Sequence, residues 1–428
     1  MAKRIELTSE KNFIGDSTYK SDDGLAYCIS GDNQFVSVEC DRYARNTLVH
    51  ANIANEVVID GKPYPVTMIR KEAFAQCAAL EKVTLPANLK FIENYSFIMH
   101  DGPLWDNLPK LKHIVIEGCK ELKNNDILLR NIERLDYDSM DTFLEMQTMI
   151  ESDSVFVDGQ EITDLMIPEG VTEVRAGLIK GCKNLLKVIL PSCIKKIQAG
   201  AFEGCENLEK VNLPDGLEII NSYAFRYCRS LKEVTLPSTI EGIGHYAFSE
   251  TAISEVNIPQ GCKLYESVFE KCKRLKKVVL PDDLTDIPVD AFRGSAIETI
   301  ELPATLQTIC SRAFANSGLT QIVMPEGLQK IGYGAFSGTI LNEITIPSTV
   351  TEIGEGVFDD CDELAHVYSK IVDPAVCDVK SFELAARSGG KKIFYRQSTL
   401  HIPNVKGLLS AYKKKAAWKK FSKIVADL

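Results

Sequence analysis

The sequence lacks the features that most often announce a membrane or nucleic-acid role. No apolar run approaches the roughly 20 residues that a membrane-spanning helix requires. Lys3 and Arg4 near the start are not followed by an apolar segment, so the N-terminus does not fit a signal peptide. Acidic residues outnumber basic ones by 59 to 49, and a net charge of -10 gives no general attraction for nucleic acid. We therefore expect no nucleic-acid partner and no integral membrane segment.

Motifs that carry chemistry are also missing. The sequence contains no G-x-S-x-G elbow, no H-E-x-x-H, no Walker A loop and no EF-hand loop. It has only six histidines, none at metal-ligand spacing to another, and no C-x-x-C pair. These absences predict a protein that is not an enzyme, with no catalytic residues, no metal site and no cofactor. An activity carried by the irregular residues 98–161 is the remaining enzymatic alternative.

An internal repeat dominates what is present. A strand-like phrase that ends in proline recurs, and from Pro168 onward these prolines are 22 or 23 residues apart. Between them an isoleucine is followed by Ala-Phe or Val-Phe, as in Ile220 and Ala224-Phe225. One such unit cannot bury both its strand and its return segment, whereas stacked units can. The pattern predicts a repeat solenoid. The prolines that end the phrase are Pro86, Pro168, Pro191, Pro214, Pro237, Pro259, Pro281, Pro303, Pro325 and Pro347.

The same periodicity predicts the core. Each phenylalanine of the small-aromatic pair is expected to lie against its equivalent in the next coil. A cysteine often follows three residues later, at one phase of the repeat. Thirteen cysteines, an odd number, do not suggest a disulfide framework, and we expect the in-phase ones to form a column of buried, reduced thiols. The in-phase residues are Cys77, Cys182, Cys205, Cys228, Cys272 and Cys361.

These phrases carry a family resemblance. The pattern L-x-x-V-x-L-P followed by I-x-x-x-A-F-x-x-C-x-x-L resembles the BspA-like leucine-rich repeats of bacterial surface proteins, over about residues 66–370. Residues 399–403, Thr-Leu-His-Ile-Pro, look like part of the tail of Bacteroides-type members, and residues 58–66 are similar to the hairpin before their first repeat. The resemblance implies a right-handed leucine-rich-repeat superhelix. Its parallel β-sheet would line the concave face, with short helical or irregular segments on the convex face.

Three parts of the chain are predicted. Residues 1–65 are expected to form a β-hairpin N-terminal cap and residues 66–370 the solenoid, because an open end would expose apolar core and unpaired strand edge. Within the solenoid, residues 98–161 lose the proline and the Ala-Phe pair and are expected to form irregular repeats. Trp105 is expected to pack over the missing phenylalanine, with an exposed binding aromatic as the alternative.

Residues 371–428 are expected to form a C-terminal cap. From Gly407 to Leu428 apolar residues recur roughly at helical spacing with lysines between them, which predicts an amphipathic helix. A basic amphipathic helix also suits a membrane surface or an anionic partner. The need to cover the end of the solenoid favours the structural interpretation.

The strand phrase also predicts a binding surface. Side chains alternate along a strand, so the residues that flank the central apolar position point out of the core. Thirteen coils would align these residues over about 60 Å at roughly 4.8 Å per strand. Threonine and valine favour strands in any case, yet several outward positions are more apolar than solubility requires, which favours a protein-binding strip on the concave face. The candidate ligand-binding residues are Val115, Met166, Ile189, Val279, Val323, His366 and Tyr368.

The resemblance implies a non-enzymatic adhesion or recognition protein, secreted or displayed on a bacterial cell surface, that binds a protein or glycoprotein. The missing signal peptide and the reduced thiols suit an alternative, a cytoplasmic protein-interaction scaffold. The pattern makes no prediction of the ligand's identity or of the oligomeric state.

Overall fold

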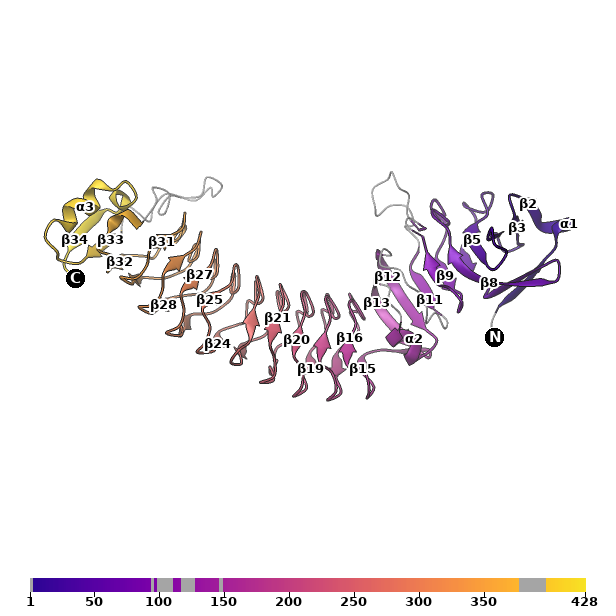
Figure 1. Ribbon diagram of the computed structural model, residues 1–428, viewed down its shortest axis with the longest axis horizontal. Coiled ribbons are helices and arrows are strands. Elements are labelled where there is room, and N and C mark those ends of the chain that lie inside the picture. The colour runs from indigo at the N-terminus through magenta and orange to yellow at the C-terminus, as the bar shows by residue number, and fades with distance from the viewer. Residues whose placement is uncertain (1–2, 94–95, 98–110, 117–127, 146–148, 377–397) are drawn as a thin grey trace. The chain divides into compact units, whose positions relative to one another are not determined.

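A computed structural model of the chain describes residues 3–93, 96–97, 111–116, 128–145, 149–376 and 398–428 (Figure 1). The chain divides into two compact units. The first holds Met1–Asp164 and Arg175–Leu185, and the second holds Leu165–Val174 and Leu186–Leu428. Trp105, for which a packing role was predicted, lies outside the described residues.

The first unit begins with a mixed sheet. Its strands β4 (Leu25–Ile29) and β5 (Val36–Cys40) pair antiparallel as a hairpin. Strand β8 (Lys62–Ile69) pairs parallel with β5 and antiparallel with β7 (Glu56–Ile59). The other elements of this sheet region are β1 (Arg4–Leu7), α1 (Ser9–Asn12), β2 (Phe13–Gly15), β3 (Thr18–Lys20) and β10 (Phe91–Ile92).

A parallel ladder follows in the same unit. Its order is β6, β9, β11, β12 and β13, with β14 antiparallel at the end. The irregular part of the sequence thus continues the ladder with longer strands, ten residues in β12 and nine in β13. After β12, α2 (Met140–Glu145) buries Phe143, whose ring meets that of Tyr137 edge-on at 5.1 Å. The bounds are β6 (His50–Asn52), β9 (Lys82–Leu85), β11 (His113–Ile116), β12 (Leu128–Tyr137), β13 (Met149–Val157) and β14 (Gln160–Glu161).

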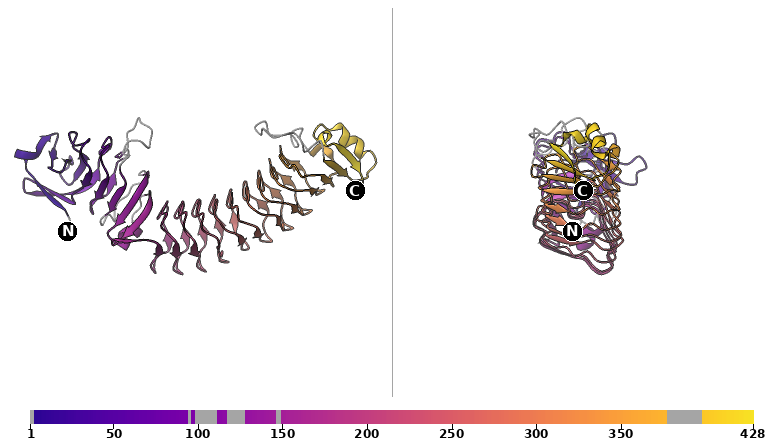
Figure 2. Two further views of the ribbon diagram at one scale, coloured as in Figure 1. Left: turned by 180° about the vertical axis from the view of Figure 1, so that it is seen from behind. Right: turned by 90° about the vertical axis from the view of Figure 1, so that its left-hand side faces the viewer.

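Most regular coils of the second unit contribute a strand to one side of the stack (Figure 2), and all of these strands except β32 are followed by the proline of the repeat. Neighbouring strands pair parallel in the register that the repeat predicts, for example Lys187 with Lys210 and Glu255 with Lys277. The phrase at residues 231–237 follows the same path without an assigned strand. The strands are β15 (Asp164–Met166), β17 (Lys187–Ile189), β19 (Lys210–Asn212), β22 (Glu255–Asn257), β24 (Lys277–Val279), β26 (Thr299–Ile300), β28 (Gln321–Ile322), β30 (Glu343–Ile346) and β32 (His366–Ser369).

The return segment forms a second parallel ladder that the sequence did not predict. Each of its strands is only two residues long and ends in the inward aliphatic residue of the coil, such as Ile220 or Ile309. These strands are β16 (Glu173–Val174), β18 (Lys196–Ile197), β20 (Ile219–Ile220), β21 (Gly242–Ile243), β23 (Lys263–Leu264), β25 (Asp286–Ile287), β27 (Thr308–Ile309), β29 (Lys330–Ile331) and β31 (Glu352–Ile353).

The predicted aromatic spine is confirmed. Eight phenylalanines of the second unit, all at most 1% exposed, stack in succession with ring centroids 5.3 to 6.0 Å apart and planes within 20° of parallel. The six in-phase cysteines are also buried, as the repeat phase indicates. The stacked residues are Phe202, Phe225, Phe248, Phe269, Phe292, Phe314, Phe336 and Phe358.

The tight turn around each phenylalanine completes the coil. In the coil of Phe314, both Arg312 and Asn316 adopt a left-handed backbone with φ of 55°. This conformation lets the amide of Phe314 donate to the carbonyl of Ala335 in the next coil, at 2.9 Å. The coils approach so closely that a Cβ on Gly332 would lie 2.5 Å from the amide nitrogen of Ser311. Glycine is therefore required at that position for steric reasons.

The C-terminal end differs from its prediction. The helix α3 covers only Leu408–Lys414, and a 3-10 turn at Trp418–Lys420 leads into strand β34 (Lys423–Ala426). The prediction of a helix that continues to Leu428 is therefore wrong. The edge of β33 (Thr399–Ile402) is covered by β34, which pairs with it in parallel. A short 3-10 turn, Pro374–Val376, accepts the indole N–H of the buried Trp418 at the Pro374 carbonyl, 3.0 Å away. Within the described ranges, no helix has the length and apolar character needed to cross a bilayer.

Candidate interaction face

Most of the predicted binding residues lie on one surface, here called the outward strip, which is the outward side of β15, β17, β19, β22, β24, β26, β28, β30 and β32. Burial alternates along these strands, so that in β30 Glu343 and Thr345 are exposed while their neighbours are buried. Met166, Val279 and Val323 are exposed by 63%, 45% and 83%. Such exposure of apolar side chains on a fixed ladder leaves a row of hydrophobic contacts available to a partner.

The remaining predicted positions are less open. Ile189 is half-buried beside Asn212, its register partner on the next strand, whose side-chain amide bonds the backbone of Leu190. Val115 belongs to the first unit, where it is half-buried in register between Thr84 and Asp136. The structure therefore places Met166, Ile189, Val279, His366 and Tyr368 on strands of the second unit, and Val323 directly after one of them, β28. Val115 lies in the first unit.

A hollow of about 720 Å³ lies over β24, β26 and β28 and brings two predicted residues together. Val279 and Val323 both line it, separated along the ladder by Thr299 and Glu301. The lining also includes charged side chains of both signs, Lys277 and Glu301. A surface that combines exposed valines with charges of both signs suits contact with another macromolecule.

Aromatic and acidic side chains meet at the C-terminal end of the outward strip. Tyr368 on β32 stacks against His401 on β33, with ring centroids 4.5 Å apart and planes 26° from parallel. The Nδ1 atom of His366 lies 3.0 Å from Nε2 of His401. His401 Nδ1 lies 2.9 Å from a carboxylate oxygen of Asp427, just past β34. Both predicted residues, His366 and Tyr368, thus belong to a cluster completed by two residues that the sequence analysis did not select.

A signal for the missed residues was present in the sequence. Thr399-Leu-His-Ile-Pro403 repeats the proline-ended strand phrase, and β33 indeed pairs with β32 so that His401 faces Tyr368. Aligning that phrase with the earlier repeats would have placed His401 in the outward column. Asp427 gave no such signal, because the strand before it lay in a segment predicted to be helical.

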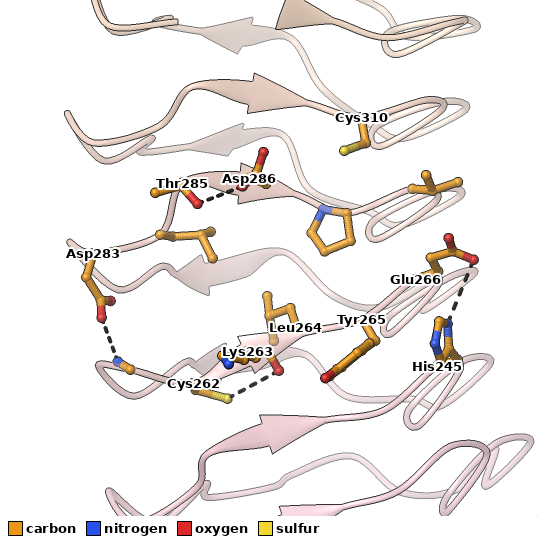
Figure 3. Close-up of a pocket in the computed structure, with 14 residues that line it drawn as sticks. His245, Cys262, Lys263, Leu264, Tyr265, Glu266, Asp283, Thr285, Asp286 and Cys310 are labelled. Carbon is orange, nitrogen blue, oxygen red and sulfur yellow. Dashed lines mark hydrogen bonds and ion pairs between the residues drawn. The ribbon is translucent and has the colours of Figure 1, made fainter.

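A second hollow, of about 580 Å³, lies on the return-segment ladder around Tyr265 (Figure 3). Tyr265 is 45% exposed and its ring centroid is 5.3 Å from that of His245. The imidazole of His245 lies 3.8 Å from the carboxylate of Glu266, while Asp283 accepts a hydrogen bond from the backbone of Gly261. The sequence analysis missed this surface because it treated only the proline-ended strands as a possible binding face.

Two buried thiols of the repeat are poor nucleophiles. Burial raises the pKa of the Cys272 and Cys361 thiols to about 11, so both remain protonated and poorly nucleophilic near neutral pH. In the first unit, burial acts to raise the pKa of Asp136, but hydrogen bonds from Arg134 and His113 outweigh it and lower the pKa. In the part of the chain that the structure describes, no group of three or more His, Cys, Asp or Glu residues is arranged to hold a metal ion.

Solved structures of bacterial repeat proteins share this architecture. The pneumococcal vaccine antigen PcpA is similar over 97% of this chain and 100% of its own, with 16% identity and a TM-score of 0.53. A leucine rich cell surface protein from Faecalibacterium prausnitzii A2-165 is similar over 87% of this chain and 99% of its own, with 20% identity and a TM-score of 0.50. At these identities the likeness concerns the fold alone. Among curated proteins, none matches this chain significantly.

A family model identifies the repeat itself. The model described as a BspA type leucine rich repeat region of six copies matches residues 50–138, 148–268 and 262–365, which is well over half of the chain. The match includes most of the irregular segment, in agreement with the continuous ladder of the first unit. The chain belongs to the BspA type leucine-rich-repeat family.

Proposed function

We propose that this chain is a non-enzymatic protein-binding module, secreted or displayed on a bacterial cell surface, that binds a protein or glycoprotein along the outward strip. The observation that carries the proposal is the exposure of Val279 and Val323, 45% and 83%, on either side of one hollow. The backbone of Val279 is held in a parallel ladder and Val323 directly follows a ladder strand, so the surface loses little conformational freedom when a partner binds. Affinity would concentrate in a few such apolar anchors within a polar rim.

Membership of a family of bacterial surface repeats supports the location. One structural relative is itself described as a cell surface protein and another as a vaccine antigen. Protease treatment of intact cells tests the location directly. We expect the chain to be cleaved before lysis, and protection that persists until the cells are broken would favour a cytoplasmic scaffold.

The binding surface is tested with paired substitutions. A partner is first captured from extracellular-matrix and bacterial-envelope extracts and then purified, and its dissociation constant is measured by biolayer interferometry. Val323→Glu, placed on the outward strip, should weaken binding by at least about tenfold, because an anchor lost from an interface typically costs more than 1 kcal/mol. Ile340→Glu is the matched control, because Ile340 is also exposed, by 51%, and belongs to none of the strands of the outward strip.

Both variants should keep the circular dichroism spectrum and melting temperature of the parent, since each replaces an exposed side chain. Equal affinities for the Val323 and Ile340 variants would contradict binding through the outward strip. Met166→Glu and Tyr368→Ala extend the test to the two ends of the strip and should also weaken binding.

A further inference from the structure

We propose that His366 and His401 form a binding site for a divalent transition-metal ion, of the Cu²⁺ or Ni²⁺ class, at the C-terminal end of the outward strip. The site does not depend on the proposed protein-binding function. It rests on the geometry of two imidazoles that face each other from neighbouring parallel strands, β32 and β33.

The carboxylate of Asp427 selects one tautomer of His401. Its Nδ1 lies 2.9 and 3.0 Å from the two carboxylate oxygens of Asp427, so Nδ1 carries the proton and donates it. Nε2 of His401 then holds a lone pair. Metal-binding histidines are typically oriented in this way by a carboxylate on the other ring nitrogen. The backbone amide of Asp427 also donates to the carbonyl of Ile402 on β33, which fixes the carboxylate beside the ring.

His366 faces Nε2 of His401 from the neighbouring strand. Its Nδ1 lies 3.0 Å from Nε2 of His401, a distance at which a single proton can join the two nitrogens. If the proton of His366 moves to its own Nε2, both facing nitrogens offer lone pairs. A metal ion takes the place of the shared proton, and rotation of the rings about χ2, a soft torsion, turns both lone pairs away from the line between the nitrogens and toward the metal.

The separation of the two nitrogens favours one class of metal ion. With metal–nitrogen bonds of about 2.0–2.1 Å, two nitrogens 3.0 Å apart subtend about 94° at the metal. Neighbouring ligands are about 90° apart in tetragonal Cu²⁺ and Ni²⁺ sites, whereas a tetrahedral site needs about 109°. Imidazole nitrogens also suit these metals better than Mg²⁺ or Ca²⁺, which prefer oxygen. Water would fill the remaining coordination positions of the metal ion.

The surroundings favour an ordered site. Tyr368 stacks on His401 at 4.5 Å and limits the tilt of the ring, and the His401 side chain is only 14% exposed. Asp427 supplies a nearby negative charge, while Glu343 is the register neighbour of His366 on β30. Lys423 is the register neighbour of Thr399 on β34 and is exposed. With two carboxylates and one lysine nearby, the local net charge favours binding of a cation.

The experiment titrates the untagged full-length chain with Cu²⁺ at pH 7.5 and follows binding by calorimetry and by electron paramagnetic resonance. We expect one Cu²⁺ per chain with hyperfine structure from two imidazole nitrogens, and competition from a large excess of Ni²⁺ but not from Mg²⁺. His366→Gln and His401→Gln should each lose the two-nitrogen signature. Asp427→Ala should lower the affinity by about 10- to 100-fold, the usual effect of removing the carboxylate behind a metal-binding histidine.

His245→Gln is the matched control, because His245 is also beside a carboxylate, that of Glu266 at 3.8 Å, but its ring lies against Tyr265 and not against a second imidazole. It should bind Cu²⁺ as the parent does. The proposal is overturned if the parent and the His366 and His401 variants bind Cu²⁺ equally. It is also overturned if the parent shows no site with two nitrogen ligands.

Discussion

Replacing Phe225 by alanine should remove one link of the aromatic spine and destabilise the second unit strongly. Phe225 is fully buried and stacks on Phe202 and Phe248, with ring centroids 5.3 Å away on either side. Removing a buried phenylalanine side chain costs about 3 to 5 kcal/mol through lost transfer energy and the cavity that remains. Each ring pair is expected to contribute about 0.5 to 1.5 kcal/mol beyond buried area.

Urea unfolding followed by circular dichroism measures this change. Phe91→Ala is the control, because Phe91 is 51% exposed and its removal should change the free energy of unfolding by about 0.5 kcal/mol or less. A double-mutant cycle separates stacking from size. Phe202→Ala with Phe225→Ala should couple by about 0.5 to 3 kcal/mol because the rings touch, whereas Phe202→Ala with Phe314→Ala should be additive. A cost below about 1 kcal/mol for Phe225→Ala, or no coupling between the adjacent pair, would refute the reasoning.

Three further predictions follow from other parts of the structure. Gly332→Ala should lower the free energy of unfolding by about 1 to 3 kcal/mol, since its Cβ would lie 2.5 Å from the Ser311 nitrogen, and an unchanged urea midpoint would contradict the close approach. Arg134 and His113 hold the pKa of Asp136 below its ordinary value, so the stability that Asp136 contributes is present at neutral pH and lost as the pH falls below about 4; Asp136→Asn should flatten that loss in acid-unfolding curves. The Cys272 and Cys361 thiols, whose pKa burial raises to about 11, should resist iodoacetamide at pH 8 in the native protein and react in urea, as mass spectrometry of the alkylated peptides would show.

Much of the stack could be predicted because its determinants repeat at a fixed interval. The prolines mark where each strand ends, and a period of 22 or 23 residues places Lys187 opposite Lys210 without any knowledge of the coordinates. The spine followed from the same spacing, because Phe202 and Phe225 occupy equal positions in adjacent coils.

The features that escaped prediction depend on contacts between segments that show no period. The return strands, such as Ile219–Ile220, are too short to produce an alternating pattern, so their ladder was not visible. Residues 423–426 have helical spacing of apolar residues, yet the open edge of β33 holds them as a strand. The pairing of His366 with His401 joins residues 35 positions apart, far from any metal-ligand spacing in the sequence.

Site-specific photo-crosslinking tests the proposed binding surface most directly. A photoreactive benzoylphenylalanine is introduced at Val323, on the outward strip, or at Ile340, outside it, and the chain is irradiated with its captured partner. The account predicts a covalent adduct from position 323 and little or none from position 340. An adduct formed from position 340 alone, or equally from both positions, would contradict it.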